Sequence, residues 1–217
     1  MDKKMNRKMR FLDTLLNTRV VTVIRTLQAV ELVPAMGALA AGGVQIIEIT
    51  STTPGYLQSI KALREHFGDS DIFVGAGTIL DAQAKCEAVE AGADFIVSPV
   101  FLPGLVRLCV DEGICVMPGC MTPTEIFGAW SMGADVIKTF PGSIVTPDIY
   151  KDLLGPFPGV RMMPTGNVNE ITAPKYIKAG AVAVGVGKAL ASEEMLLNNR
   201  LDEITNNARK FSALVQP

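Results

Sequence analysis

Two ionisable side chains, one acidic and one basic, stand inside separate apolar runs of the sequence. Glu48 follows Ile46 by two positions, and Lys138 follows Val136 by two positions. Side chains alternate along a β-strand, so each charged residue shares a strand face with its apolar neighbour. Because Ile46 and Val136 are typical of a protein interior, we expect Glu48 and Lys138 to point inward as well.

A buried amine beside a buried carboxylate can carry out carbonyl chemistry. Loss of hydration disfavours the ammonium form of a lysine, and the neutral amine is a nucleophile toward a carbonyl carbon. A facing carboxylate can move protons while the carbinolamine forms and at the carbon beside the iminium. The alternative is a structural ion pair, but burial of two charges is unfavourable and more often accompanies a chemical role. The pair therefore favours an enzyme that forms a Schiff base.

A recurring pattern indicates the elements that must position this pair. A helical segment ends at a glycine and a short β-branched run follows at once, as after Gly92 and Gly133. Glycine ends a helix in the left-handed conformation, so each such point is predicted to lead directly into a buried strand. The expected strands are 20–25, 45–50, 72–75, 95–97, 115–118, 136–139, 161–165 and 182–186.

These units predict an α/β fold, a single (β/α)₈ TIM barrel over residues 1–217 with a short N-terminal helix. The strands are apolar on both faces, which is typical of parallel strands covered on both sides. An open doubly wound sheet is the alternative, but no G-x-G-x-x-G fingerprint follows the first strand. Alternate strands fill the layers of a barrel interior, so the second and sixth strands can bring Glu48 and Lys138 together.

The last two expected strands end in residues suited to an anion. Phosphate sites in this fold are commonly built from the loops after strands seven and eight. Gly166 and Asn167 follow the seventh strand, and Gly187 and Lys188 follow the eighth. Glycine lets the backbone approach a ligand, free N–H groups at a helix start attract an anion, and the lysine adds a positive charge. Glycine-rich strand ends that serve only for turning are the alternative.

Composition excludes several classes of protein. The formal net charge of −2 gives no electrostatic footprint for nucleic acid, and no uninterrupted apolar stretch predicts a membrane span. Four cysteines without C-x-x-C spacing and a single histidine predict neither disulfides nor a metal site, and no cofactor is expected. No signal peptide is expected, so the location is predicted to be cytoplasmic. The main basic cluster is predicted to be a solvated first helix, with Lys3, Lys4, Arg7, Lys8 and Arg10.

Some helix boundaries also have sequence signals. Thr122 and Glu125 form a capping box with proline at the first helical position, and Thr146-Pro147 is expected to be a cap of similar kind. Pro174 lies a few residues into the seventh expected helix, so it is predicted to kink or shorten that helix.

Between residues 20 and 189, seven motifs occur in an order and spacing that match a known family. They are Glu48-Ile49-Thr50, Gly75-Ala76-Gly77-Thr78, Ser98-Pro99, Pro118-Gly119, Lys138-Thr139-Phe140-Pro141, Gly155-Pro156-Phe157-Pro158 and Pro164-Thr165-Gly166. Together they resemble the 2-dehydro-3-deoxy-phosphogluconate/4-hydroxy-2-oxoglutarate aldolase family. The resemblance implies a class I aldolase of carbohydrate metabolism, usually a homotrimer, that splits a 2-oxo acid into pyruvate and an aldehyde. The aldehyde would be glyceraldehyde 3-phosphate for the sugar acid and glyoxylate for 4-hydroxy-2-oxoglutarate.

The resemblance also implies roles for individual residues. Lys138 matches the Schiff-base lysine and Glu48 the general acid/base. Thr78 matches a contact to the pyruvate carboxylate, and Thr165 lines the aldehyde side. The predicted substrate-binding residues are Arg25, Thr52, Thr78, Pro99 and Thr165. The predicted phosphate-binding residues are Gly166, Asn167, Gly187 and Lys188.

Three positions depart from the family pattern. Thr52 stands where some members carry an arginine for the substrate carboxylate, so Arg25 is expected to supply that charge. Asn167 replaces a usual glycine, and Lys188 replaces a common serine, both in the predicted phosphate region. These two changes leave open which aldehyde is released, so a 2-dehydro-3-deoxy-6-phosphogalactonate aldolase is an alternative. Two further alternatives are another phosphate-binding barrel enzyme, such as an isomerase or synthase, and a non-catalytic binding or assembly protein that keeps the barrel.

Overall fold

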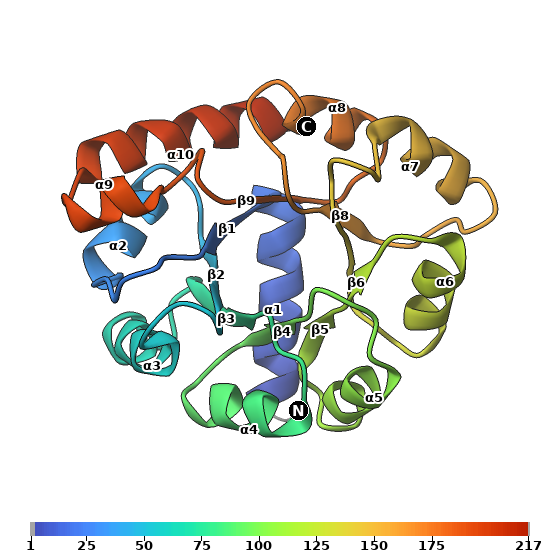
Figure 1. Ribbon diagram of the computed structural model, residues 1–217, viewed down its shortest axis with the longest axis horizontal. Coiled ribbons are helices and arrows are strands. Elements are labelled where there is room, and N and C mark those ends of the chain that lie inside the picture. Colours follow the sequence, from blue (N-terminus) through green and yellow to red (C-terminus); the bar gives the residue numbers. More distant parts are fainter. Residues whose placement is uncertain (1–2, 217) are drawn as a thin grey trace.

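Parallel strands ring the centre of the molecule, and helices cover their outer side (Figure 1). The computed structural model describes residues 3–216, with side chains from residue 6 onward. The strands are β1 (Val20–Ile24), β2 (Ile46–Thr50), β3 (Phe73–Gly77), β4 (Phe95–Val97), β5 (Cys115–Met117), β6 (Gly119–Cys120), β7 (Ile137–Thr139), β8 (Met162–Pro164) and β9 (Val184–Val186). The helices are α1 (Lys3–Thr18), α2 (Val33–Ala41), α3 (Tyr56–Phe67), α4 (Ala82–Glu90), α5 (Pro103–Asp111), α6 (Pro123–Ser131), α7 (Pro147–Leu154), α8 (Ala173–Lys178), α9 (Glu193–Leu197) and α10 (Leu201–Val215).

The strands close into a barrel. Hydrogen bonds connect β5-β4-β3-β2-β1-β9 in one run and β6-β7-β8 in another. Pro118 separates β5 from β6, since proline has no N–H to donate to the ladder. The other junction is made by a parallel bridge between Thr165 and Gly185, and by the Val182 N–H, which donates to the Met162 carbonyl at 3.0 Å. The predicted (β/α)₈ barrel is confirmed.

Two apolar layers hold this barrel together. The larger layer lies between the strands and the surrounding helices. The smaller layer fills the barrel interior, and both Ile46 and Val136 belong to it, as strand alternation predicted. Gly75 gives this interior room, because a Cβ atom there would lie 2.3 Å from the ring of Phe95.

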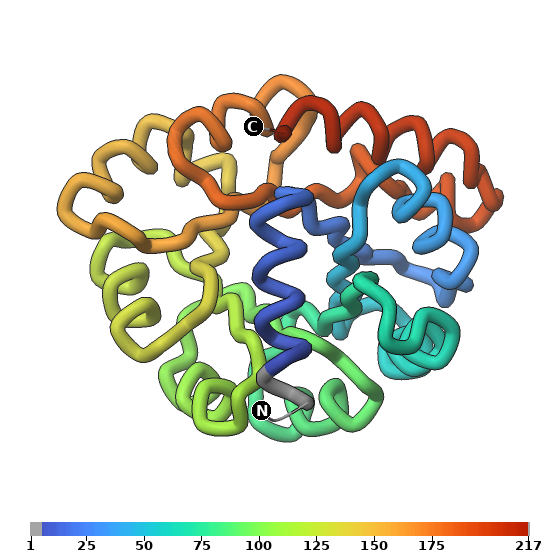
Figure 2. Tube along the Cα trace, turned by 180° about the vertical axis from the view of Figure 1, so that it is seen from behind, coloured from blue at the N-terminus to red at the C-terminus, as the bar shows by residue number. Residues whose placement is uncertain are grey.

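Helix α1 seals the end of the barrel at which the strands begin, where it crosses the ring in Figure 2. Phe11 and Leu15 are fully buried against the interior layer. The Phe11 ring stacks on Phe95 at 4.7 Å between centroids and meets Phe73 edge-on at 5.6 Å. The prediction of a solvated first helix is therefore wrong.

The basic residues of α1 are fastened to the barrel by acidic residues near the strand starts. Arg7 pairs with Asp94 at 2.9 Å, Lys8 with Asp135 at 2.8 Å, and Arg10 with Asp71 at 2.6 Å. The predicted cluster also included Lys3 and Lys4, whose side chains lie outside the described residues. The other basic residues bind the helix to the barrel, Arg7 and Lys8 through partly buried pairs and Arg10 through an exposed one.

Other boundaries show which sequence signals were sufficient. The capping box of Thr122 and Glu125 is present. Thr146 precedes α7, but its side chain makes no capping hydrogen bond, so that prediction is wrong in this detail. Pro174 lies in the first turn of the short helix α8, where the missing N–H has no partner to lose, so it does not kink the helix. Over residues 3–216, no helix combines the length and apolar character needed to cross a membrane.

Candidate active site

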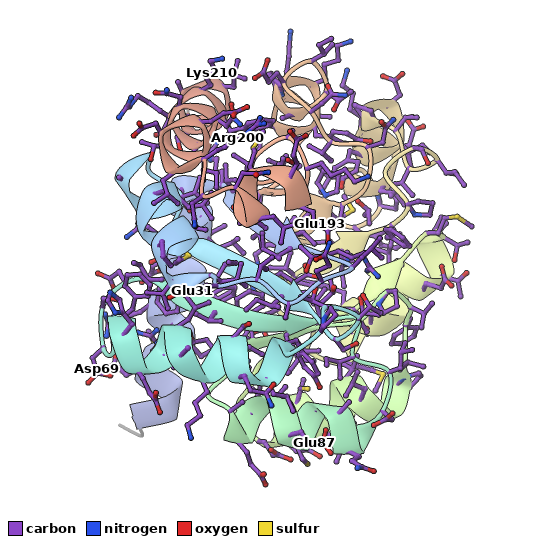
Figure 3. All side chains as sticks on the ribbon, turned by 60° about the vertical axis from the view of Figure 1, so that its left-hand side comes forward. Glu31, Asp69, Glu87, Glu193, Arg200 and Lys210 are labelled. Atoms are coloured by element: carbon purple, nitrogen blue, oxygen red, sulfur yellow. The ribbon has the colours of Figure 1, made fainter. Side chains whose placement is uncertain are left out.

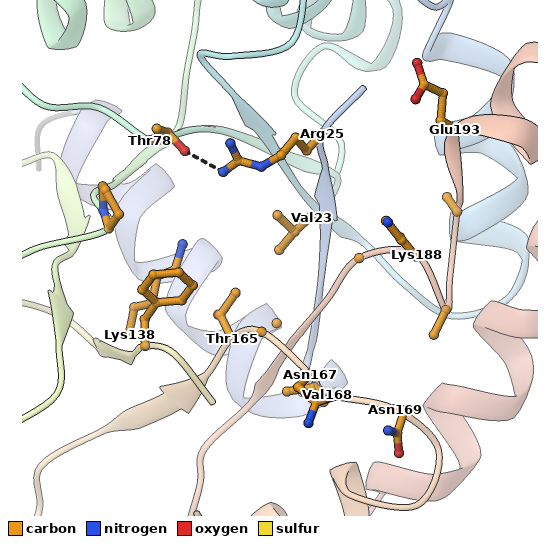
Figure 4. Close-up of a pocket in the computed structure, with 17 residues that line it drawn as sticks. Val23, Arg25, Thr78, Lys138, Thr165, Asn167, Val168, Asn169, Lys188 and Glu193 are labelled. Carbon is orange, nitrogen blue, oxygen red and sulfur yellow. Dashed lines mark hydrogen bonds between the residues drawn. The ribbon is translucent and has the colours of Figure 1, made fainter. Parts of the chain in front are cut away.

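A cavity of about 520 Å³ opens at the end of the barrel where the strands finish (Figure 4). Its walls come from the ends of β1, β3, β4, β7, β8 and β9. The predicted site residues that line it are Arg25, Thr78, Pro99, Lys138, Thr165, Gly166, Asn167, Gly187 and Lys188. The remaining two do not line it, but each contacts a lining residue: the buried Glu48 contacts Lys138, and the exposed Thr52 contacts Arg25.

Lys138 and Glu48 meet across the barrel interior. The Lys138 Nζ lies 3.5 Å from Glu48 Oε1, and the two residues are only 5% and 0% exposed. This separation is longer than a charge-assisted hydrogen bond, and neither oxygen of Glu48 has a hydrogen-bond partner among the described residues. The carboxylate is therefore buried with free lone pairs, directly beside an amine that reaches the cavity.

Two neighbours shape the surroundings of this pair. A Cβ atom on Gly77 would lie 2.0 Å from Glu48 Oε1, so only glycine at this position leaves room for the carboxylate. The Lys138 Nζ also lies 5.5 Å from the ring centroid of Phe140, within reach of a cation–π contact. Phe140 was not among the predicted site residues. Strand alternation could have found it, since it stands two positions after Lys138 and shares its face.

A second charge of the cavity, that of Arg25, is fixed by two threonines. Arg25 donates from Nη1 to Thr52 Oγ1 at 2.8 Å and from Nη2 to Thr78 Oγ1 at 3.0 Å. Figure 4 shows the bond to Thr78. Thr78 has a φ of +59°, an unfavourable conformation for a β-branched residue that is concentrated at functional sites. The guanidinium is thus held in one orientation and remains positioned to receive a carboxylate.

The predicted phosphate residues lie on the other wall, after β8 and β9. Gly166 and Asn167 both have positive φ, +88° and +56°, which turns the chain sharply at the cavity edge. The side chains of Asn167 and Lys188 are exposed and make no hydrogen bond or ion pair with the rest of residues 3–216. They are therefore available to a ligand.

Thr165 is placed between these two walls. It is 7% exposed, and its hydroxyl has no partner within the described part of the chain. Gly185 allows this position, because a Cβ atom there would lie 2.3 Å from Thr165 Oγ1. The residue thus lines the cavity, while its hydroxyl is buried against Gly185 of β9 without a hydrogen-bond partner.

The three buried cysteines are poorly suited to act as nucleophiles. Burial raises the pKa of the Cys109 and Cys120 thiols to about 12 and that of Cys115 well above its usual value. These thiols stay protonated near neutral pH and do not compete with a lysine amine. In the part of the chain that the structure describes, no three His, Cys, Asp or Glu side chains gather into a possible metal site.

The fold and the cavity together define a (β/α)₈ barrel with a cavity at the carboxyl ends of its strands, which is where enzymes of this fold carry out their chemistry. The family model of the KDPG and KHG aldolases matches residues 12–207. The chain therefore belongs to the KDPG and KHG aldolase family, and it is a carbon–carbon lyase that acts on a small molecule.

Individual relatives agree with this assignment. The chain is 35% identical over 168 residues to a 2-dehydro-3-deoxy-phosphogluconate aldolase of Pseudomonas aeruginosa, covering 76% of each chain. It is 31% identical over 172 residues to a 2-dehydro-3-deoxy-6-phosphogalactonate aldolase of Escherichia coli, covering 79% of this chain and 83% of the relative. A solved KDPG aldolase of Legionella pneumophila, with pyruvate captured as a covalent carbinolamine, has a TM-score of 0.83 at 28% identity. That match covers 92% of this chain and 96% of the other.

Proposed function

We propose that the protein is a class I aldolase that binds its 2-oxo acid through a Schiff base on Lys138. The observation that carries this proposal is the amine of Lys138, which reaches the cavity 3.5 Å from the unpartnered carboxylate of Glu48. The Legionella relative, with its covalently captured pyruvate, supports the same chemistry.

The first stage forms the imine. The neutral amine of Lys138 attacks the carbonyl carbon C2 of the substrate, and the carbonyl oxygen takes up a proton to give a carbinolamine. Glu48 lies close enough to pass the protons that this step requires, and loss of water then leaves the iminium ion. The iminium withdraws electrons from the neighbouring carbon far more strongly than the original ketone does.

The second stage breaks the carbon–carbon bond. Glu48 removes the proton from the hydroxyl on C4, the C3–C4 electron pair moves into the iminium, and an aldehyde leaves. The resulting enamine takes a proton back from Glu48 at C3, which gives the pyruvate iminium. Water then attacks this iminium, releases pyruvate and regenerates the amine.

The fixed residues of the cavity orient the substrate for these steps. Arg25, held by Thr52 and Thr78, would bind the C1 carboxylate, and Thr78 also contacts that end. Pro99 and Thr165 would line the sides, with Thr165 beside the part that leaves as the aldehyde. Binding in one orientation accounts for a large part of the acceleration of such reactions.

The far wall suits a negatively charged substrate end. Gly166, Asn167, Gly187 and Lys188 would bind the phosphate of 2-dehydro-3-deoxy-6-phosphogluconate, with Lys188 as the cationic contact. The same cavity can take 4-hydroxy-2-oxoglutarate, which has a carboxylate at that end. The Escherichia coli relative keeps 2-dehydro-3-deoxy-6-phosphogalactonate aldolase open as a second candidate. A phosphate-binding isomerase or synthase would not need the inward pair of Lys138 and Glu48.

The family resemblance extends the proposal beyond the cavity. We infer a cytoplasmic homotrimer in which residues 1–217 form one domain, without a metal or other cofactor. Sedimentation of the purified protein at several concentrations tests the trimer, because a monomer at all concentrations would contradict it.

Replacement of Lys138 tests the proposed chemistry. We expect Lys138→Ala and Lys138→Arg to abolish pyruvate release from either substrate, because neither side chain can form an imine. Lys151→Ala is the matched control, since it removes an exposed lysine of α7 outside the cavity. Thermal unfolding of all three variants checks that the barrel survives, and pyruvate release by folded Lys138→Ala at the rate of the control would refute the proposal.

A further inference from the structure

Glu193 is a charged residue of the cavity wall that the chemistry above does not use. It is the first residue of α9 and lines the cavity together with Lys188. In Figure 3 it lies over the body of the molecule, whereas Asp69, Glu87 and Lys210 lie at the outline. The motifs of the sequence did not single it out.

The carboxylate of Glu193 holds the loop after β1. Its Oε1 accepts the backbone N–H of Leu27 at 2.7 Å and that of Gln28 at 3.0 Å. Two consecutive N–H groups on one anionic oxygen are strong, charge-assisted hydrogen bonds. They tie the chain just beyond Arg25 to α9 and fix the position of the carboxylate at the cavity wall.

The charges around the cavity are therefore unequally distributed. Among the side chains that the structure describes, the charged ones that line it are those of Arg25, Lys138, Lys188 and Glu193. Lys188 and Glu193 both come from the segment after β9, on the side of the cavity away from Lys138 (Figure 4). This distal end thus contains one cation and one anion, while a substrate phosphate carries nearly two negative charges.

We propose that Glu193 determines specificity at the distal end of the cavity. Its fixed negative charge opposes a doubly charged phosphate and offsets the attraction of Lys188, which lowers the preference for phosphorylated over unphosphorylated 2-oxo sugar acids. The proposal rests on the aldolase function proposed above. It concerns only the end of the substrate that leaves as the aldehyde.

The replacement Glu193→Gln isolates the charge. The glutamine carbonyl can still accept both N–H groups, so the loop after β1 stays tied while the negative charge is removed. Glu194→Gln is the matched control, because Glu194 is the next residue of α9, its side chain is 69% exposed and it pairs with Arg200. It does not line the cavity.

The measurement is the ratio of kcat/KM for 2-dehydro-3-deoxy-6-phosphogluconate to kcat/KM for the same sugar acid without its phosphate. We expect Glu193→Gln to raise this ratio by about 5- to 10-fold at low salt, and by less at high salt because ions screen the charge. Glu194→Gln is expected to leave the ratio unchanged. An unchanged ratio in Glu193→Gln, or an equal rise in both variants, overturns the proposal.

Hydrogen exchange distinguishes an effect of the lost charge from an effect of the lost contact with the loop after β1. We expect the amides of Leu27 and Gln28 to exchange faster in Glu193→Ala than in the wild type, but not in Glu193→Gln. Faster exchange in Glu193→Gln would mean that a released loop changed the ratio, which would also overturn the charge-based proposal.

A third arm tests the underlying aldolase chemistry by itself. Pyruvate has no distal group, so borohydride trapping of pyruvate on the wild-type protein depends on the amine and not on Glu193. Failure of trapping would contradict the proposed Schiff-base aldolase function. Trapping combined with an unchanged substrate ratio would remove only the role of Glu193.

Discussion

Lys8 and Lys138 each face a buried carboxylate, at opposite ends of the same barrel. Lys8 Nζ lies 2.8 Å from Asp135 at the end sealed by α1, and Lys138 Nζ lies 3.5 Å from Glu48 at the open end. Asp135 and Lys138 are only three residues apart, just before and within β7. One short segment therefore contributes to two lysine–carboxylate pairs that stand in different electrostatic settings.

The difference lies in the hydrogen bonds that surround each carboxylate. Asp135 uses one oxygen for Lys8 and accepts the Val116 N–H with the other at 3.0 Å. Glu48 is 0% exposed, and neither of its oxygens has a hydrogen-bond partner among the described residues. Buried polar groups in a stable structure are normally satisfied, so the unsatisfied oxygens of Glu48 are an exception that fits the role proposed for them. The closed end contributes stability, and the open end keeps groups free for a substrate.

Of the replacements that test this difference between the two ends, that of Glu48 is expected to have the largest effect. Glu48→Gln should slow proton exchange at the methyl group of pyruvate by about 10²–10⁴-fold, the usual range for a lost acid/base group. Imine formation should persist in part, because Lys138 remains. Proton NMR of pyruvate in deuterated water measures this rate, and unchanged exchange would remove Glu48 from the mechanism.

The paired lysine at the closed end should behave in the opposite way. Lys8→Met is expected to lower the free energy of unfolding by about 2–4 kcal/mol, because it leaves Asp135 buried without its counter-charge. The kcat of the folded variant should stay near that of the wild type. Denaturant unfolding measures the loss, and a variant with full stability but impaired kcat would contradict the division between the two ends.

Much of this contrast could be predicted from the sequence, and the rest depends on contacts between distant residues. Strand alternation brought Glu48 and Lys138 into one interior, because side-chain direction in a strand is a local property. The role of α1 could not be predicted this way. Arg7, Lys8 and Arg10 find their acidic partners more than 60 residues later, at strand starts that meet only in the closed barrel.

Glu193 was missed for a related reason. Its partners are two backbone N–H groups about 165 residues earlier, and no side-chain pattern marks a backbone donor. Thr146 shows the converse case, since the sequence carries a cap signal and the side chain makes no capping bond. Local signals thus gave the elements and the central pair, whereas the surroundings of the cavity required the tertiary structure.

A smaller effect is expected at the cation of the distal wall. Lys188→Ala should raise KM about 10-fold or more for the phosphorylated sugar acid, because a charge-assisted contact is lost. KM for 4-hydroxy-2-oxoglutarate should hardly change. Steady-state kinetics on both substrates decide the point, and equal small effects would leave Lys188 without a role in phosphate binding.

The smallest expected effect is at a helix cap far from both pairs. Backbone N–H groups of Met121 and Thr122 donate to Glu125 and lower its pKa, so the ionised form stabilises the fold. This contribution is present above the unfolded pKa, near 4.3, and is lost as the pH falls through the lower folded value. Glu125→Ala should therefore cost about 0.3–1 kcal/mol at pH 7 and almost nothing near pH 2. Denaturant unfolding at the two pH values measures it, and an equal loss at both would contradict the charge-based explanation.

The central claim is that Lys138 is the reactive amine of the cavity. Incubation with pyruvate and borohydride, followed by digestion and mass spectrometry, identifies the lysine that carries the reduced adduct. We expect the adduct on Lys138, with none on Lys188, which lines the same cavity, and none on the paired Lys8. An adduct on another lysine, or no adduct on any lysine, would contradict this claim.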